Sequence, residues 1–431
     1  MERCSFILPK KKRRCKMLVK KGNKFCGEHF IFDENNVERI PCPNDPKHTV
    51  NRNELEDHLN NRCNSRLRID YPWIVENCNF DLRNENMEDF LKLQLNERDL
   101  IRMVKIIHKI CEDLQLSGLI QKSFLETPII QKFMDESREM SATRRKHLAQ
   151  YSSIIGCLKY SKLLFDDDDC CLIELGAGKA HLSYWLTKIV PKYTFLLIDR
   201  MGMRNKFDNK ALKENPQLKL VRLRCSVEHL DLSRISFVKV FFPFTAFNFF
   251  IKKYIYILFF LNSCCVTAIC KHFCGNATDY GIRCLLNGFQ KGVKLKGFVL
   301  APCCHHKSLY NQYFGKDYLK NYGINSSYQF AALRHIASWS TCGMIHPCQD
   351  MEVNTSSNNF TVPNFSNISY LWTKEQKEEF GFQAKMVLEM GRVLELQKYG
   401  FEVNLHKYID CSISPENLLI IGRRCEISEN L

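Results

Sequence analysis

No apolar segment follows Met1, where a secretory signal would have one; charged and basic residues come at once. The chain also lacks an apolar run of the roughly 20 residues needed to span a bilayer. The stretch from Tyr254 to Ile269 has 16 residues, and Lys252 and Lys253 precede it. We therefore expect neither a secreted protein nor stable membrane association, and contact of the 241–269 stretch with a membrane surface remains a weaker alternative.

Acidic residues are missing near the start of the chain. Between Lys10 and Lys24 there are nine Lys or Arg and no Asp or Glu. Over the whole chain, 62 Lys and Arg exceed 47 Asp and Glu, which gives a formal net charge of +15. This charge suits a polyanionic partner or an anionic membrane surface. The run Pro9–Arg14 also has the composition of a nuclear localisation signal.

Cysteine, by contrast, is abundant, with 22 in 431 residues. Such a number indicates either extracellular disulfides or intracellular metal ligands and reduced thiols. Because no secretory signal is evident, the second interpretation is favoured. We expect a protein of the nucleus, the cytoplasm or both.

The coarse pattern changes along the chain. Two short Cys/His units, 1–33 and 38–66, come first, and residues 67–140 are charged and mixed, with helical periodicity in Asn96–Leu114 and Ile129–Met140. We interpret 67–140 as a helical linker. From about residue 141, strands alternate with helices, which predicts an α/β fold with a parallel, doubly wound, Rossmann-like sheet. The expected elements are a helix at Lys146–Tyr160, a helix at Ala180–Ile189, and strands at Cys171–Leu175, Thr194–Ile198, Lys219–Cys225, Gly297–Ala301, Phe401–Lys407 and Asn417–Ile421.

The second Cys/His unit has the spacing of a zinc site. Its candidate ligands are Cys42, His48, His58 and Cys63, and two thiolates with two imidazoles suit tetrahedral zinc. The segment Asn53–Arg62 has helical character and would carry His58. A unit this small can hardly build its own core, so the metal would supply folding energy. The alternative is a chance cluster of surface side chains.

The first unit offers Cys4, Cys15, Cys26 and His29. Cys26 and His29, separated by two residues, form a compact half-site that the other two cysteines can complete. A basic tail with incidental thiols is the alternative interpretation.

The segment Leu172–Ser183 carries the clearest cofactor signal. An apolar strand runs into Glu174, Gly176 and Gly178 and then into a helix, whose free N–H groups suit an anion such as the methionine carboxylate of S-adenosylmethionine. The next strand ends on Asp199, whose carboxylate can accept hydrogen bonds from ribose hydroxyls. A dinucleotide site would prefer a third glycine where His181 stands, which disfavours a dehydrogenase. The alternative interpretation is an ordinary strand-to-helix turn that binds no ligand.

Two later segments carry groups for proton transfer. One contains Lys271, His272 and Asp279, and the other is Cys303-Cys304-His305-His306, directly after an expected strand. A ribose 2′-hydroxyl becomes a good nucleophile when a neighbouring base takes its proton. We consider Lys271, His272, Asp279, His305 and His306 as candidates. The Cys-Cys-His-His run can instead bind a metal, but four adjacent residues rarely wrap one ion, so a pocket wall of thiols and imidazoles is the favoured interpretation. Buried cysteines and a capping histidine without a function are the other alternative.

These motifs together resemble the eukaryotic tRNA 2′-O-ribose methyltransferases that act on nucleotide four of the acceptor stem. The resemblance runs nearly end to end and includes both fingers, the second of which is similar to one in a minor-spliceosome protein. It also rests on 146–148, 174–185, 199–200, 222–232, 271–284, 303–306, 338–340 and 414–417.

The resemblance implies a methyltransferase domain over 141–431 behind two zinc modules. It implies S-adenosylmethionine contacts near Glu174, Gly176, Gly178 and Asp199, zinc on Cys42, His48, His58 and Cys63, and tRNA, through its acceptor stem, as the partner. It does not identify the general base, the set of tRNAs or any protein partner.

Three features depart from the family pattern. His58 and Cys63 are separated by four residues where the family usually has three, and Ser226 stands where the family usually has an acid. Residues 241–269 form an apolar insertion between an expected strand and the Lys271 segment. The last two features favour a second hypothesis, a non-catalytic RNA-binding protein with a degenerate methyltransferase fold.

Overall fold

The computed structural model describes residues 3–8, 13–20, 22–34, 36–63, 71–82, 95–137, 139–165, 170–201, 206–235, 237–240, 255–258, 264–341 and 371–425. The chain divides into two compact units, Met1–Ile69 and Asp70–Leu431. The strands are β1 Ile7–Leu8, β2 Arg13–Arg14, β3 Arg39–Cys42, β4 Asp45–Asn51, β5 Gln121–Lys122, β6 Cys170–Leu175, β7 Thr194–Ile198, β8 Lys219–Leu223, β9 Phe237–Val240, β10 Ile255–Leu258, β11 Cys265–Cys274, β12 Leu295–Cys303, β13 Phe401–Lys407 and β14 Leu418–Arg424. The helices are α1 Leu55–Asp57, α2 Glu97–Asp113, α3 Leu116–Leu119, α4 Pro128–Glu136, α5 Ala142–Tyr160, α6 His181–Ile189, α7 Phe207–Glu214, α8 Asn276–Gln290, α9 Lys316–Asn321, α10 Ser327–Ala337 and α11 Lys374–Gln397.

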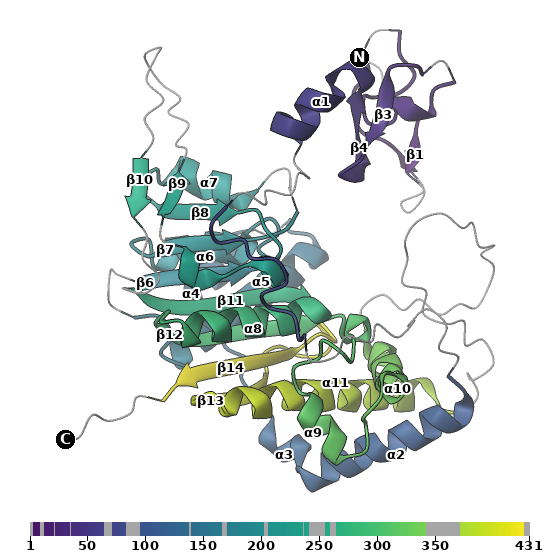
Figure 1. Ribbon diagram of the computed structural model, residues 1–431, viewed down its shortest axis with the longest axis vertical. Helices are drawn as coiled ribbons and strands as arrows, with labels where there is room; N and C mark the ends of the chain where they lie inside the picture. Colours follow the sequence, from purple (N-terminus) through teal and green to yellow (C-terminus); the bar gives the residue numbers. More distant parts are fainter. Residues whose placement is uncertain are drawn as a thin grey trace. The chain divides into compact units, whose positions relative to one another are not determined.

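The large unit is built on an eight-stranded sheet in the order β5-β13-β14-β12-β11-β6-β7-β8 (Figure 1). The five strands from β8 to β12 in that order are parallel, which confirms the expected doubly wound core. The C-terminal pair differs from a wholly parallel sheet, because β14 runs antiparallel to both β12 and β13. A tight return between β13 and β14 needs no crossover helix, so antiparallel pairing is the natural outcome there.

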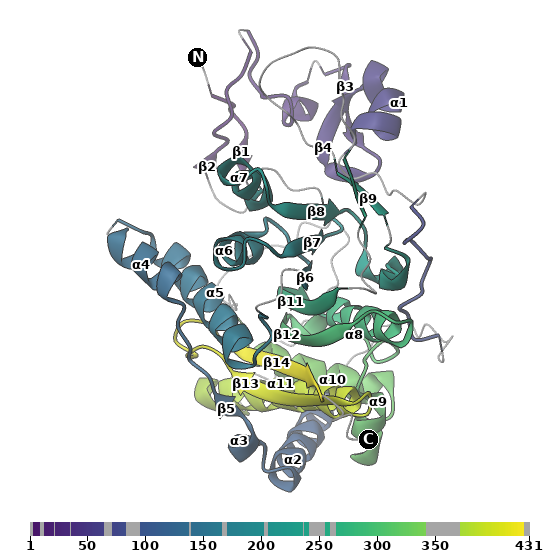
Figure 2. The same ribbon diagram turned by 90° about the vertical axis from the view of Figure 1, so that its left-hand side faces the viewer.

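Both faces of the central strands are buried, each by its own set of helices. Along β6, Ile173 and Leu175 belong to one apolar cluster, and Cys170 and Leu172 to the other. Successive side chains of a strand point to opposite faces of the sheet. The alternation therefore places the two clusters on opposite faces, with the sheet as the middle of three layers. The first cluster contains buried residues of α2, α8, α10 and α11; the second contains those of α4, α5, α6 and α7 (Figure 2).

Capping residues account for several helix starts. Asn96 and Asp99 form a capping box at the start of α2, and Thr373 and Gln376 form one at the start of α11. Ser141 caps α5 by accepting a hydrogen bond from the Arg144 N–H, so this helix begins four residues earlier than its apolar pattern predicts.

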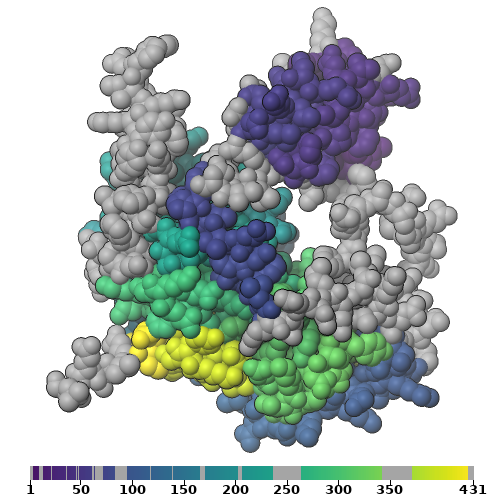
Figure 3. Space-filling model, in the orientation of Figure 1, coloured from purple at the N-terminus to yellow at the C-terminus, as the bar shows by residue number. Residues whose placement is uncertain are grey.

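The segment interpreted as a linker is largely part of the large unit. The buried side chains of α2 join the apolar cluster that α10 and α11 line, and Leu100, Ile107 and Ile110 are completely buried. In the space-filling view, residues 71–82 run across the teal and green surface (Figure 3). They are held there by polar contacts: the Asn79 amide donates to the carbonyls of Val227 and Leu230 at 2.7 and 2.8 Å.

The apolar stretch 241–269 does not interrupt the sheet. Its last five residues open β11, where Cys265–Ile269 pair in register with Cys170–Glu174 of β6. Within the stretch, β10 pairs with β9, which precedes the stretch, in a separate two-stranded antiparallel sheet. Among the described residues, no helix combines the length and apolarity required to cross a membrane.

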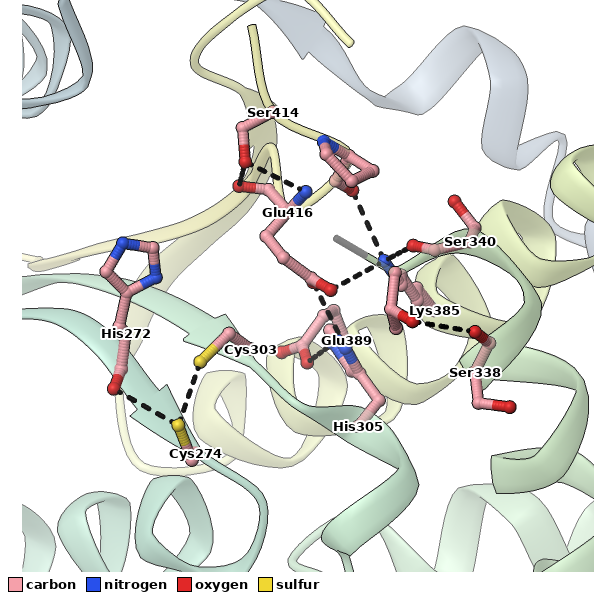
Figure 4. A network of polar contacts seen from close by, with 12 residues as sticks. His272, Cys274, Cys303, His305, Ser338, Ser340, Lys385, Glu389, Ser414 and Glu416 are labelled. Carbon is pink, nitrogen blue, oxygen red and sulfur yellow. Dashed lines mark hydrogen bonds and ion pairs between the residues drawn. The ribbon is translucent and has the colours of Figure 1, made fainter. Parts of the chain in front are cut away.

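A buried network of charges ties the C-terminal part of the sheet to its helices. Figure 4 shows one part of it, where Glu389 lies beside His305 and Lys385 lies beside Glu416. Arg392 of α11 donates from Nε and Nη2 to the two carboxylate oxygens of Asp279, at 2.9 and 2.8 Å, and from Nη1 to Glu389 at 2.5 Å. Glu389 also contacts His305 Nε2 at 2.7 Å. Burial opposes ionisation of Glu389, but Arg392 and His305 outweigh it and lower the pKa of this carboxyl. The network therefore holds paired, ionised groups in the core.

Replacing Arg392 by Met is expected to destabilise the large unit strongly, by about 3–5 kcal/mol, because it leaves Asp279 and Glu389 buried without their cation. The midpoint of urea unfolding measures this loss. Lys132→Met is the control: its exposed pair with Glu136 at 3.9 Å should contribute less than about 1 kcal/mol. Equal effects of the two substitutions would contradict the assigned role of Arg392.

Candidate functional site

The sheet reverses its order of connection between β6 and β11, and this point lies beneath the glycine loop. From β6 the chain proceeds outward to β7 and β8, then returns to β11 and β12 on the other side. In open α/β sheets the ligand crevice forms at the carboxyl ends of strands flanking such a switch. The glycine loop follows β6, and Lys271 lies near the carboxyl end of the strand β11. The topology thus brings two of the predicted segments together.

The loop that follows β6 adopts conformations that its sequence permits. Gly176 and Gly178 have φ of 68° and 50°. A side chain on Gly176 would lie 2.9 Å from the ring of Phe273 in β11, so glycine also allows close packing. Asp199 holds the loop in place: one carboxylate oxygen accepts from Gly178 N–H at 2.6 Å and the other from Met201 N–H at 2.7 Å. Each oxygen has a further lone pair for a ligand hydroxyl.

Glu174 lies inside the domain behind the loop. Its carboxylate accepts hydrogen bonds from the hydroxyl and the N–H of Ser183, in the first turn of α6. Burial raises the pKa of this carboxyl to about 7. Glu174 therefore fixes the start of α6, whose free N–H groups lie at the loop, and it is a positioning residue in this arrangement.

Arg222 is a loop contact that the motif analysis did not single out. Its Nη1 donates to the Gly178 carbonyl at 3.1 Å and its Nε to Asp208 at 2.5 Å. The remaining nitrogen, Nη2, is buried and has no partner among the described residues. The signals in the sequence are a basic residue inside an expected strand and its place at the start of the 222–232 segment, which belongs to the family resemblance.

Lys271 has the strongest chemical signature among the five proton-transfer candidates. It is 8% exposed, its Nζ lies 3.3 Å from Nδ1 of His147, and it sits 3.8 Å above the ring of Tyr151. Burial lowers the pKa of this amine to about 7, against the opposing effect of Glu174. An amine with such a pKa is half-neutral at physiological pH and can accept a proton.

Two of the other four candidates are engaged in the core of the domain. Both carboxylate oxygens of Asp279 and Nε2 of His305 belong to the buried network around Arg392. His272 follows Lys271 with a left-handed φ of 61°, and burial lowers its pKa to about 4. His306 has a buried Nδ1 without a hydrogen-bond partner among the described residues, and burial lowers its pKa. A neutral imidazole is the expected state of both.

A cavity of about 580 Å³ adjoins His147 and Tyr151. Its walls come from α4, α5, α6 and α7, and they combine aromatic rings with cationic side chains. The aromatic residues are Phe133, Tyr151, Tyr184, Trp185 and Phe207, and the cationic ones are Lys132, Arg144, Lys188 and Lys210. Rings and cations in one concave surface suit bases and phosphates.

In the small unit, the second predicted cluster is assembled with tetrahedral spacing. The Sγ atoms of Cys42 and Cys63 are 3.5 Å apart, the Nε2 atoms of His48 and His58 are 3.2 Å apart, and Cys42 Sγ is 3.2 Å from His58 Nε2. A zinc tetrahedron with ordinary bond lengths has edges of roughly 3.3–3.8 Å. These four residues therefore fit zinc, and the four-residue spacing between His58 and Cys63 does not prevent the fit.

The first cluster is also assembled. Cys4, Cys15, Cys26 and His29 bring their ligand atoms within 4.8 Å of one another. Nδ1 of His29 lies 3.5 Å from the sulfur of Cys4 and 3.4 Å from that of Cys26. The ring of His29 stacks on Phe6 with centroids 4.0 Å apart, which fixes its orientation.

The two zinc modules are joined through β4. Thr49 donates from its N–H to the Glu28 carboxylate at 3.0 Å and from its hydroxyl to the Gly27 carbonyl at 2.9 Å. Arg39 in turn donates to the Thr49 carbonyl at 2.7 Å. The modules thus form one folded unit.

Replacing Cys42 by Ser should lower the zinc content by one equivalent per chain and unfold 38–66, because a unit of this size depends on its metal. Metal analysis by plasma mass spectrometry, with circular dichroism, measures both. Cys78→Ser, a cysteine outside the described clusters, is the matched control. Unchanged zinc in the Cys42 variant would contradict the assignment.

Comparison with known proteins agrees with both units. The chain matches the family described as "Methyltransferase TRM13" over residues 149–423. It also matches the "CCCH zinc finger in TRM13 protein" over 2–29 and the "U11-48K-like CHHC zinc finger" over 39–64. These matches identify zinc as the metal of the two clusters, and membership of a methyltransferase family implies S-adenosylmethionine as the cofactor.

Curated relatives match over nearly their whole length. The mouse protein named "tRNA:m(4)X modification enzyme TRM13 homolog" is 28% identical, with 97% of this chain and 93% of the relative covered. The human homologue is 29% identical, with 97% and 94% covered. The Kluyveromyces lactis protein named "tRNA:m(4)X modification enzyme TRM13" is 28% identical, with 98% and 95% covered.

Among solved structures, the methyltransferase domain of bacterial CtHen1-CN is 11% identical with a TM-score of 0.28, and it covers 63% of this chain and 95% of that one. A likeness at this level carries no weight for function. The family match spans well over half of the chain and contains the glycine loop, Asp199 and Lys271. The chain therefore belongs to the TRM13 methyltransferase family.

Proposed function

We propose that this protein transfers the methyl group of S-adenosylmethionine to the 2′-hydroxyl of the ribose at nucleotide four of a tRNA acceptor stem. The observation that carries the proposal is Lys271, a buried amine with a pKa of about 7 at the switch point that also holds the glycine loop. The names of the relatives support tRNA as the substrate.

The cofactor supplies a sulfonium-bound methyl group, and the residues of the chain orient and activate the acceptor. Asp199 would accept hydrogen bonds from the ribose hydroxyls of S-adenosylmethionine. The N–H groups at the start of α6 would bind the carboxylate of its methionine part. Neutral Lys271 takes the 2′-hydroxyl proton onto Nζ as the oxygen–methyl bond forms and the sulfur–methyl bond breaks. Lys271 then releases this proton to solvent and returns to its neutral form.

The side chains around Lys271 suit an RNA substrate. The helix α5 forms part of the aromatic and cationic wall of the 580 Å³ cavity. The same helix carries His147 and Tyr151, which contact Lys271. Lys and Arg on these walls bind phosphates without regard to sequence, and rings can stack against a base. The zinc modules and the basic residues near the N-terminus add further phosphate contacts, in keeping with the net charge of +15.

Replacing Asp199 by Ala should weaken binding of S-adenosylmethionine by tenfold or more while RNA affinity changes little, because the carboxylate holds the glycine loop through Gly178 and would accept hydrogen bonds from the cofactor. Calorimetry measures the first quantity and filter binding the second. Glu402→Gln, an exposed acid of β13, is the control. Parallel loss of both affinities would mean that Asp199 only maintains the fold.

The methyl-transfer rate should rise about tenfold from pH 5.5 to 6.5 and level off above pH 7.5. The cause is the lowered pKa of Lys271, which makes the amine neutral, and thus able to accept a proton, only as the pH passes about 7. Lys271→Arg stays protonated and should lose the rise and about 100-fold in single-turnover rate. Lys159→Arg, exposed at the end of α5, is the control. A pH profile unchanged in the Lys271 variant would exclude this lysine as the base.

The second candidate function is RNA binding without catalysis. Ser226, in place of the family's usual acid, is the observation that favours it. Calorimetry of the folded wild-type chain distinguishes the two functions. RNA binding without measurable S-adenosylmethionine binding would overturn the enzyme proposal.

A further inference from the structure

The strands β11 and β12 end side by side on cysteines. Cys274 is the last residue of β11, Cys303 is its register partner at the end of β12, and Cys304 follows. The sulfur atoms of Cys274 and Cys303 lie 3.1 Å apart and face each other in Figure 4. All three ligand atoms lie within 4.8 Å of one another. Neither matched zinc finger includes these residues, since those matches end at residue 64.

The backbone at this edge departs from regular strand geometry in a way that gathers the thiols. Consecutive side chains of an extended strand point to opposite faces, so Cys303 and Cys304 would normally diverge. Cys304 instead has a left-handed conformation, φ 52° and ψ 44°, which an ordinary side chain seldom adopts. On the neighbouring strand, a register irregularity at His272, also left-handed, precedes Cys274. Strained residues of this kind concentrate at functional sites.

We propose that Cys274, Cys303 and Cys304 form a third metal site, for a thiophilic divalent ion such as zinc. Three sulfur ligands match the preference of such ions, and the single buried thiol, Cys303, is flanked by the half-buried Cys304 and the exposed Cys274, so an ion can enter from solvent. On binding, three S–H groups release their protons and three metal–sulfur bonds form. His306, two residues beyond Cys304, does not bring a ring nitrogen within the 4.8 Å that joins the three sulfur atoms, so the fourth position is left to solvent.

This site lies at the end of the strand that carries Lys271. A metal there would clamp the ends of β11 and β12 together directly beyond the proposed base. The assignment does not depend on methyl transfer, because the ligands and their geometry belong to the sheet edge itself.

The test is the metal content of the full-length chain, purified under reducing conditions and analysed by plasma mass spectrometry. We expect three equivalents of zinc per chain, and a decrease of one equivalent in Cys274→Ser, whose exposed side chain makes misfolding the least of the three risks. Cys411→Ser, an exposed cysteine outside the described clusters, should retain all three. Two equivalents in the wild type, unchanged in the Cys274 variant, would overturn the proposal.

Cobalt substitution supplies a second readout that does not rely on counting. Thiolate-to-cobalt charge-transfer absorption near the ultraviolet should decrease in Cys274→Ser and in Cys303→Ser, with thermal unfolding of each variant checked against the wild type. Absorption equal to that of the wild type in both folded variants would overturn the assignment. A mass 2 Da below that of the reduced chain, with a Cys274–Cys303 link in the peptide map under the same reducing conditions, would also overturn it and make the pair a disulfide.

Discussion

Arg392 satisfies two buried carboxylates at once, and the site edge depends on this arrangement. Asp279 belongs to α8, which follows β11, and Glu389 passes the interaction on to His305, which follows β12. Glu416, before β14, lies 3.8 Å from Nδ1 of His305 and pairs with Lys385 of α11 at 3.1 Å. The connections behind three neighbouring strands are therefore tied to one helix, α11. Because isolated buried charges are so costly, this packing has one favourable arrangement. The network therefore fixes the positions of the carboxyl ends of β11 and β12.

The central fold was predictable because its chemistry is local. A buried strand, two glycines and an acid one helix and one strand later were sufficient to place β6, α6, β7 and the loop, and both zinc clusters followed from ligand type and spacing. The helix α11 was not anticipated. Its buried face contains Lys385, Glu389 and Arg392, which break the apolar periodicity that identifies a helix in sequence.

The proposed site was only partly foreseeable for a similar reason. Lys271, His272, Asp279 and His305 were all selected as candidates for proton transfer. Lys271 lies in β11, which pairs with β6 of the glycine loop, whereas Asp279 and His305 are paired inside the core. Their partners lie more than 80 residues away along the chain, so only the fold reveals that those charges are engaged. Arg222 and the convergence of Cys274 with Cys303 depend on strand register, which one sequence does not specify.

The β9–β10 hairpin shows where this architecture tolerates change. It lies in the crossover that carries the chain from β8 at the sheet edge back to β11 beside the centre, and its strands pair only with each other. The entropy cost of a longer connection grows only with the logarithm of its length, so extra residues here impose little penalty on the sheet. Residues can therefore be added to this crossover during evolution without changing the register of the parallel strands.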